Sequence, residues 1–171
     1  MTFLYYGIVK YSINAQRIRE LTLHCLRDTL ALNNTHAAET SLLDLQTLER
    51  MMTDATFNIA DGAHGLLIAF DQDADYDGVN FNWFKSRYDS FVYVDRIVIA
   101  AHTRGKGLAR HYYSQLFEHA RAAGHGRVTC EINLDPPNPG SIMFHAKMGF
   151  NEIGRANLEN GKTVSYQEKL L

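Results

Sequence analysis

The stretch that decides the fold is Val92–Ala123, which reads VYVDRIVIAAHTRGKGLARHYYSQLFEHARAA. It begins with β-branched and aromatic residues that predict a strand, breaks at a loop with Gly105 and Gly107, and continues with helical periodicity. The apolar residues of one helix face are Leu108, Tyr112, Leu116, Phe117 and Ala120. A strand, a glycine loop and a helix in this order indicate an anion site, because glycines let a ligand approach the backbone and the first N–H groups of a helix lack internal partners.

Two common nucleotide-binding motifs do not match this loop. A Walker loop ends in Gly-Lys-Ser/Thr, whereas here Gly107 follows Lys106. A dinucleotide-binding loop needs a third glycine where this chain has Arg110. The pattern that remains is Arg-x-x-Gly-x-Ala, from Arg104 to Ala109, and its basic side chains add positive charge. We therefore expect the loop to bind a phosphate or a pyrophosphate.

Length and composition are typical of one soluble domain. The chain has 171 residues, of which 46% are hydrophobic and 21% charged, and its formal net charge is -2. We expect a single domain over residues 1–171. The basic excess of a sequence-independent nucleic-acid binder is absent, so no nucleic-acid partner is expected. Because no apolar run is long enough to cross a bilayer and the first residues lack the pattern of a secretory signal, we expect a cytoplasmic protein without a membrane partner.

Cysteines and histidines indicate neither a disulfide framework nor a metal site. Cys25 and Cys130 are the two cysteines and lie far apart in the sequence, which fits reduced thiols. The eight histidines do not occur at ligand spacing with a carboxylate between them, and no Cys-x-x-Cys is present. We expect no metal.

Strand and helix patterns alternate before the central stretch. A first strand is expected over 3–9, and a helix over 14–32 that ends at the pair Asn33-Asn34. Ser41 is the expected N-cap of a second helix. Asp61-Gly62 then predicts the turn of a hairpin.

The acidic segment 71–83 and the C-terminal residues follow other patterns. Residues 71–83 predict a solvated loop, and the alternative is that its aromatic residues, Tyr76, Phe81 and Trp83, wall a substrate mouth. Asn160-Gly161 predicts a second hairpin turn near the C-terminus. We expect the exposed edge of that hairpin to make a homodimer possible.

A second motif lies about thirty residues after the glycine loop, in NPGSIMFHAKMGF over residues 138–150. Its characteristic residues are Asn138, Ser141, Phe144, Gly149 and Phe150. Together with the Arg-x-x-Gly-x-Ala pattern, this motif resembles the GNAT superfamily of acyl-CoA-dependent N-acetyltransferases, and within it a bacterial subgroup without an assigned substrate. The resemblance covers about 91–154 most clearly.

The resemblance implies an α/β fold with a mixed central sheet of about six or seven strands and helices on both faces. It also implies that two parallel strands, Val92–Ile99 and Val128–Asn133, splay apart and hold acetyl-CoA between them. Backbone groups of the first strand would pair with the pantetheine arm, and the loop amides would hold the pyrophosphate. The implied cofactor-binding residues are Ile97, Val98, Ile99, Arg104, Gly105, Lys106, Gly107, Leu108, Ala109, Asn138 and Ser141.

An amine acceptor must lose a proton before it attacks a thioester, so the implied reaction needs a base or a water chain to one. Glu131 is the first candidate, because it lies on the second splayed strand and its side chain is expected opposite Val128, Cys130 and Ile132. The alternative is an exposed or ion-paired strand glutamate. Asp95 is a second candidate, although its neighbour Arg96 favours a structural ion pair.

The departing thiolate accepts a proton, which the family commonly supplies from a tyrosine in the second motif. This chain has His145 at that position. Two roles are open for His145. The imidazole either donates a proton, as its ordinary pKa permits near neutrality, or only hydrogen-bonds the cofactor or a neighbouring backbone group.

The implied function is transfer of an acetyl group from acetyl-CoA to a primary amine by direct attack, without a covalent enzyme intermediate. The acceptor is a small molecule or a protein. The competing interpretation is a non-catalytic acyl-CoA-binding or regulatory module. A nucleotide hydrolase is a weaker third interpretation because both nucleotide motifs fail.

Overall fold

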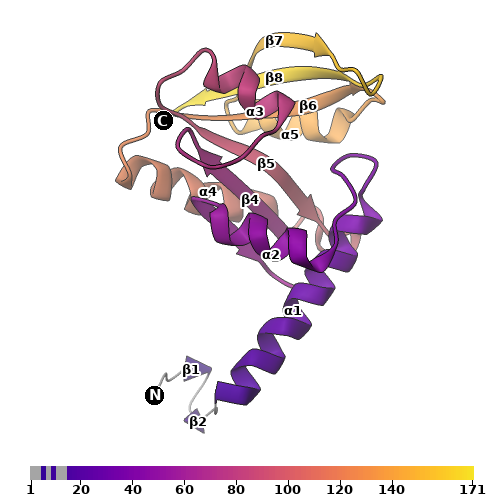
Figure 1. The fold of residues 1–171 in the computed structure, drawn as a ribbon, viewed down its shortest axis with the longest axis vertical. Coiled ribbons are helices and arrows are strands. Elements are labelled where there is room, and N and C mark those ends of the chain that lie inside the picture. The colour runs from indigo at the N-terminus through magenta and orange to yellow at the C-terminus, as the bar shows by residue number, and fades with distance from the viewer. Residues whose placement is uncertain (1–4, 7–8, 11–14) are drawn as a thin grey trace.

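The computed structural model describes residues 5–6, 9–10 and 15–171. Six strands form the main sheet: β3 (Phe57–Ala60), β4 (Gly65–Asp71), β5 (Val92–Ile99), β6 (Arg127–Asp135), β7 (Asn151–Asn157) and β8 (Thr163–Leu170). Their order across the sheet is β3-β4-β5-β6-β8-β7 (Figure 1). Two short strands, β1 (Tyr5–Tyr6) and β2 (Val9–Lys10), pair with each other in a separate sheet. The strand predicted over 3–9 falls largely outside the described residues.

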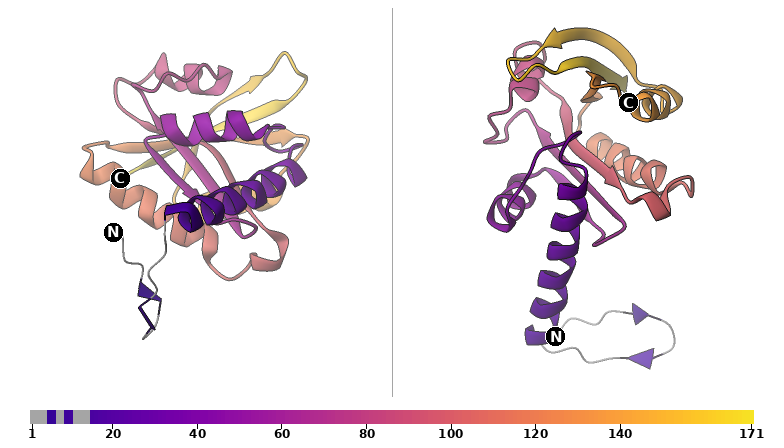
Figure 2. Two further views of the ribbon diagram at one scale, coloured as in Figure 1. Left: turned by 60° about the horizontal axis from the view of Figure 1, so that its bottom comes forward. Right: turned by 90° about the vertical axis from the view of Figure 1, so that its right-hand side faces the viewer.

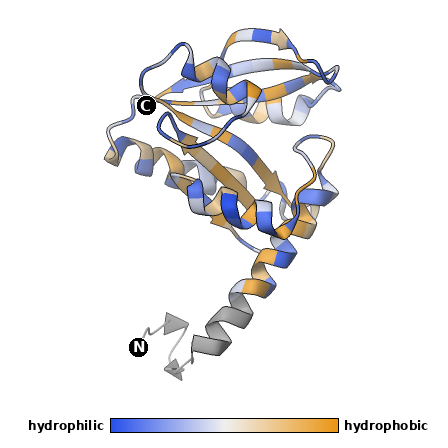
Figure 3. Ribbon diagram, viewed as in Figure 1, coloured by the Kyte–Doolittle hydropathy of each residue, from blue (hydrophilic) through white to orange (hydrophobic). Residues whose placement is uncertain are grey.

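Helices cover both faces of this sheet, as expected for the α/β class (Figure 2). The helices are α1 (Ala15–Thr35), α2 (Leu45–Asp54), α3 (Val79–Lys85), α4 (Leu108–Ala122) and α5 (Pro139–Lys147), with a short 3-10 turn η1 (Ala101–Thr103). Residues of α2 and α3 pack with Leu66, Ile68 and Phe70 on one face of β4. Residues of α4 and α5 pack with Leu67 and Ala69 on the other. Strand β4 is therefore buried on both sides and hydrophobic along its length (Figure 3).

The two central parallel strands separate after three residue pairs. β5 and β6 pair only at Val92↔Val128, Tyr93↔Thr129 and Val94↔Cys130. The register of β5 against β4 shifts at the same height, because Val94 and Arg96 pair with consecutive residues of β4 and Asp95 is left over. Such a bulge bends the strand that carries it. Beyond it, β5 follows β4 and β6 follows β8, so the splay expected of these strands is present.

Both predicted hairpin turns are confirmed. Asp61-Gly62 joins β3 to β4, and Asn160-Gly161 joins β7 to β8. The predicted face of β6 is also confirmed, since Val128, Cys130 and Ile132 pack together in the cluster beneath α4. Local turn chemistry and strand alternation were sufficient for these features.

The boundaries between the first two helices differ from the prediction. Helix α1 continues through Asn33 and Asn34 to Thr35. The N-cap of α2 is Asp44, whose Oδ1 accepts from the amide of Thr47 at 2.7 Å, and not Ser41. The two asparagines do not break the helix because their side-chain amides bond the carbonyls of the following loop, at 2.9 Å each. Residues 36–44 are called the α1–α2 loop below.

The acidic segment is more ordered than a solvated loop. Its second half forms α3, and Phe81 is fully buried, so Phe81 does not wall a substrate mouth. Tyr76 stacks on Phe70 and donates its hydroxyl hydrogen bond to Asp95. Trp83 stacks on Tyr166 of β8 with 4.0 Å between the ring centroids. Aromatic packing against the sheet thus overrides the polar composition of the segment.

Candidate active site

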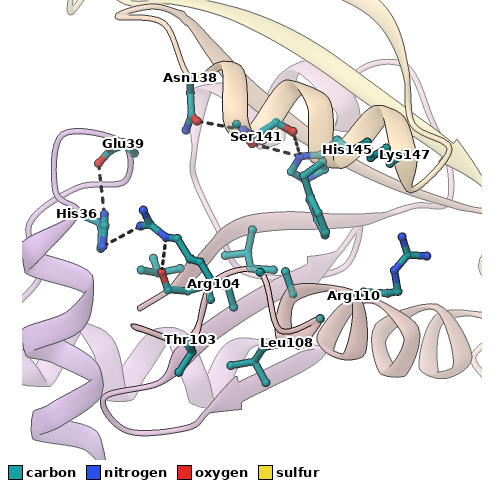
Figure 4. Close-up of a pocket in the computed structure, with 18 of the residues that line it drawn as sticks. His36, Glu39, Thr103, Arg104, Leu108, Arg110, Asn138, Ser141, His145 and Lys147 are labelled. Atoms are coloured by element: carbon teal, nitrogen blue, oxygen red, sulfur yellow. Dashed lines mark hydrogen bonds and ion pairs between the residues drawn. The ribbon is translucent and has the colours of Figure 1, made fainter. Parts of the chain in front are cut away.

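A cavity of about 730 Å³ opens where β5 and β6 separate. Its walls come from four segments: the end of β5, the glycine loop with the start of α4, the helix α5, and the α1–α2 loop (Figure 4). The expected cofactor residues that line it are Ile97, Val98, Ile99, Arg104, Gly105, Gly107, Leu108, Ala109, Asn138 and Ser141. Segments that lie far apart in the sequence therefore meet at one cavity.

The glycine loop presents backbone to this cavity. Gly105 and Gly107 have φ values of 75° and 85°, a left-handed conformation that favours glycine. A Cβ atom placed on either would meet no heavy atom within 4 Å, so the space beside the loop is open. Gly107 is the N-cap of α4 and provides no side-chain hydrogen bond to the first turn. The first amides of α4 thus fit an anionic group.

The two basic residues of the loop line different pockets. Arg104 Nε donates to the carbonyl of Ile99 at 3.0 Å, and its Nη2 lies 3.3 Å from Nε2 of His36. Lys106 lines a second, smaller pocket with His64 and His111 and is not on the wall of the main cavity. Of these two cations, only Arg104 therefore lines the main cavity.

Helix α5 begins at the cavity wall with the capping that its sequence predicts. Asn138 is the N-cap, and its Oδ1 accepts from the amide of Ser141 at 3.1 Å. Pro139 occupies the first turn, where its missing N–H costs no helical hydrogen bond. This cap fixes the Ser141 hydroxyl on the cavity wall.

His145 lines the cavity with little exposed surface, and both of its ring nitrogens have partners inside the fold. Nδ1 lies 2.8 Å from the carbonyl of Ser141, which can only accept, so Nδ1 carries the proton. Nε2 then accepts from the Tyr113 hydroxyl at 2.7 Å. Burial lowers the pKa of His145. This geometry favours the second of the two expected roles, a neutral imidazole that bonds its neighbours.

Glu131 lies at the point where β5 and β6 part, one residue after the last residue pair. Its Oε2 is buried and has no hydrogen-bond partner among the described residues. Burial is the main reason that the pKa of this carboxyl rises to about 7, and the neighbouring Asp95 carboxylate raises it further. Glu131 does not line the cavity, so it stands behind the wall and not on it.

Asp95 forms the ion pair with Arg96 that the sequence predicted. Arg96 Nε lies 2.6 Å from Asp95 Oδ2, and the two side chains are only 6% and 7% exposed. With Tyr76 also donating to it, Asp95 has both carboxylate oxygens engaged. Asp95 is therefore a weak candidate for a base that must accept a proton from a substrate.

Sequence reasoning did not identify the individual residues of one cavity wall. The α1–α2 loop contributes His36, Glu39 and Thr40, and α5 contributes Lys147 near its end. No local motif marks these residues. The loop lies here because Arg96 of β5 reaches Asn33, which is 63 residues away in the chain, and a contact of that range leaves no pattern in a single sequence.

Two further observations bear on partners. In the part of the chain that the structure describes, no helix is long and apolar enough to cross a membrane. Within the same residues, no three histidine, cysteine or carboxylate side chains gather in a way that holds a metal ion.

Comparison with known proteins adds a family and a set of similar folds. The acetyltransferase (GNAT) family matches residues 45–150. No curated protein matches the chain significantly in sequence.

Three solved structures illustrate the similarity. A NatC complex bound to Gag peptide and CoA has a TM-score of 0.63 at 11% identity, over 86% of this chain and 91% of that one. The ribosomal-protein-S18-alanine N-acetyltransferase from Escherichia coli scores 0.59 at 14% identity, over 94% and 91%. The ribosomal-protein-alanine N-acetyltransferase from Brucella melitensis scores 0.57 at 21% identity, over 85% and 94%. At these identities the similarity concerns the fold alone.

The hydrogen bond between His145 and Tyr113 leads to a stability prediction. We expect His145→Phe to lower the free energy of unfolding by about 1–3 kcal/mol, because the buried Tyr113 hydroxyl loses its acceptor. The double variant Tyr113→Phe/His145→Phe should lose less than the sum of the single losses. Urea unfolding at pH 7 measures all three, and strictly additive losses would show that the two side chains do not interact.

The raised pKa of Glu131 leads to a second stability prediction. The folded protein favours protonated Glu131, so the wild type should lose stability as the pH rises from about 4.5 to about 7. The variant Glu131→Gln lacks this loss. Its melting temperature relative to the wild type should therefore rise across that window and stay level above it. Glu118→Gln, at an exposed position of α4, is the matched control. If the difference in melting temperature between Glu131→Gln and the wild type is the same at every pH, the pKa of Glu131 is not raised in the folded protein.

Proposed function

Because the chain belongs to the acetyltransferase (GNAT) family, we propose that it transfers the acetyl group of acetyl-CoA to a primary amine by direct attack on the thioester. The observation that carries the proposal is the cavity beside the end of β5 that no longer pairs with β6, with the glycine loop at one end and α5 along its side. A long cosubstrate with a pyrophosphate fits such a shape, since the anion-binding amides and the strand edge line one continuous space.

The cofactor-binding roles follow from the cavity walls. The amides of residues 105–109 hold the pyrophosphate, and the glycines keep side chains out of its way. Backbone groups of residues 97–99, which β6 no longer pairs with, bond the pantetheine arm. An N–H of this edge also polarises the thioester carbonyl as an oxyanion donor. Asn138 and Ser141 border the pantetheine arm from the α5 side.

Lys106 has a separate place in this proposal. It lines the second pocket, beside the glycine loop and next to His64 and His111. We expect its ammonium to act on the phosphates of CoA from outside the main cavity as a charge, with the backbone amides making the direct contacts.

Glu131 is the proposed base. A carboxyl with a pKa of about 7 is ionised in part of the molecules near neutrality and is basic enough to take a proton from an ammonium through a water. The amine nitrogen then forms a bond to the acetyl carbon and the carbon–sulfur bond breaks. The proton released from nitrogen returns to the CoA sulfur by way of solvent. His145 supports the Ser141 end of α5 in this scheme and is not the acid.

The acceptor side is closed by the α1–α2 loop and the hairpin between β7 and β8. Lys162 of this hairpin donates to the carbonyl of Ala38 at 2.8 Å, so the two segments meet. Two of the similar structures are named for acetylation of an alanine of a ribosomal protein. A protein N-terminus and a small amine are thus both acceptor classes to be tried. A non-catalytic CoA-binding module remains the alternative.

The proposed function has a direct test. The protein should release CoA thiol from acetyl-CoA when an effective amine from a panel of peptides and small amines is added, and release should stop without the amine. Thiol release is followed with a chromogenic disulfide, and the acetylated amine by mass. Tight CoA binding without thiol release for any amine would instead identify a binding module.

The glycine loop provides a prediction for CoA binding. Gly107→Trp should weaken CoA binding at least tenfold, because an indole would fill the space beside the first amides of α4. The matched control is Gly124→Trp at the other end of the same helix. Gly124 has the same φ of 85° and equally open surroundings, so its backbone strain is alike. Calorimetric titration with CoA measures both variants, and equal affinities would remove the loop from the binding site.

The base provides a prediction for turnover. Glu131→Gln should lower kcat by about 10²–10⁴ without a matching change in CoA affinity. In the wild type, kcat/KM should fall as the pH drops below about 7, because protonated Glu131 cannot accept the proton of the amine. Steady-state rates between pH 5.5 and 9 test both effects. If kcat/KM of Glu131→Gln still falls below about pH 7 as in the wild type, another group is responsible for that fall.

A further inference from the structure

The buried ion pair of Asp95 and Arg96 joins two parts of the molecule. The residues are neighbours on β5, at the bulge where this strand turns away from β6. Their contact is 2.6 Å long and nearly without exposed surface. A buried ion pair adds little net stability, since desolvation offsets the attraction. The contacts that Asp95 and Arg96 each make with other residues are therefore more informative about their roles than the ion pair itself.

Arg96 holds the α1–α2 loop. Its Nη1 donates to Asn33 Oδ1 at 3.0 Å, and its Nη2 lies 3.4 Å from the Ser41 hydroxyl. Asn33 in turn donates to the Ser41 carbonyl at 2.9 Å. The guanidinium thus ties the last turn of α1 and Ser41 of the loop to the sheet. The loop between these anchors carries the cavity residues His36, Glu39 and Thr40.

Asp95 acts on Glu131, because these two residues directly follow Val94 and Cys130, the last pair of the two parallel strands. The titratable groups that face Glu131 are Asp95 and Tyr93 on β5, Tyr76 before α3, Tyr113 on α4, Cys130 on its own strand and Tyr166 on β8. Burial raises the pKa of every one of these phenols and of the thiol, so they are neutral near pH 7. Among these groups Asp95 is the other carboxyl, its charge opposes ionisation of Glu131, and Arg96 lies 2.6 Å from it.

We propose that Asp95 and Arg96 are positioning residues with separable tasks: the Asp95 carboxylate sets the electrostatics of Glu131, and the Arg96 guanidinium holds the acceptor wall. The inference deepens the proposed function, since it takes Glu131 as the base. One pair of side chains then affects both the basicity of the catalytic carboxylate and the position of the loop that receives the amine.

The charge task is tested by titrating Glu131 directly. Protein labelled with ¹³C at the glutamate carboxyl carbons is titrated by NMR, and the Glu131 resonance is identified by its absence in Glu131→Gln. Asp95→Asn should lower the midpoint of Glu131 by about one pH unit, because a like charge is removed. Arg96→Met should raise it, because Asp95 loses its compensating cation. Opposite shifts from the two variants are a signature that mere loosening of the fold does not produce.

The bracing task is tested with Arg96→Lys. Lysine keeps the charge but not the planar fork that reaches Asn33 and Ser41 together. The Glu131 midpoint should stay within a few tenths of a unit, while the amide of Leu43, which donates to Asn34 at 3.0 Å, should exchange with solvent faster. With an active acceptor, KM for the amine should rise.

Arg127→Met is the matched control, because it removes a partly buried ion pair with Glu168 at the far end of β6. It should change neither the Glu131 midpoint nor the exchange of Leu43. Equal midpoints in Asp95→Asn and wild type would overturn the charge task, and wild-type exchange in Arg96→Lys would overturn the bracing task. If Arg96→Met does not fold, Asp95→Asn and Arg96→Lys still decide both. The titration needs neither acetyl-CoA nor an acceptor, so an inactive protein with the expected shifts would refute the proposed function alone.

Discussion

The separation of β5 from β6 is the constraint on which the rest of the structure depends. Two parallel strands pair for three residues and then part, because the bulge at Asp95 keeps β5 with β4 while β6 continues along β8. Strand edges that face each other without pairing must bond something else. Here the opening faces α5 on one side and the glycine loop on the other, so the unpaired edge of β5 becomes a wall of the cavity.

The same separation accounts for the two carboxyl groups, Asp95 and Glu131, in the interior of the protein. Asp95 and Glu131 directly follow the last pair on their strands, where β5 and β6 no longer pair with each other. Tyrosines from β5, β8 and the segment before α3 close over these carboxyls. Desolvation then raises the pKa of Glu131 to about 7, whereas Asp95 stays paired with Arg96. The two neighbouring carboxyls thus have different partners: Asp95 bonds Arg96 and Tyr76, whereas Oε2 of Glu131 has no hydrogen-bond partner among the described residues.

Local chemistry made much of the fold and part of the candidate site predictable from the sequence. The glycine loop, the apolar face of α4, the two hairpin turns and the cap at Asn138 all depend on residues within a few positions of each other. The misassigned features depend on distant contacts. Ser41 is a plausible N-cap by composition, yet Asp44 takes that place because Asn33 and Arg96 hold Ser41 in the preceding loop.

Residue type alone also did not determine what a candidate side chain can do. Lys106 lies two residues from Arg104 in the same loop, yet the two face different pockets, because the left-handed Gly105 between them changes the direction of the chain. His145 occupies a position expected to supply a proton, and its chemistry is set by Tyr113, a residue of another helix. An imidazole whose carbonyl partner fixes the proton on Nδ1 and whose other nitrogen accepts from a phenol is held in one tautomer. The Tyr113 hydroxyl and the Ser141 carbonyl thus hold the His145 imidazole in place beside the cavity, next to the start of α5.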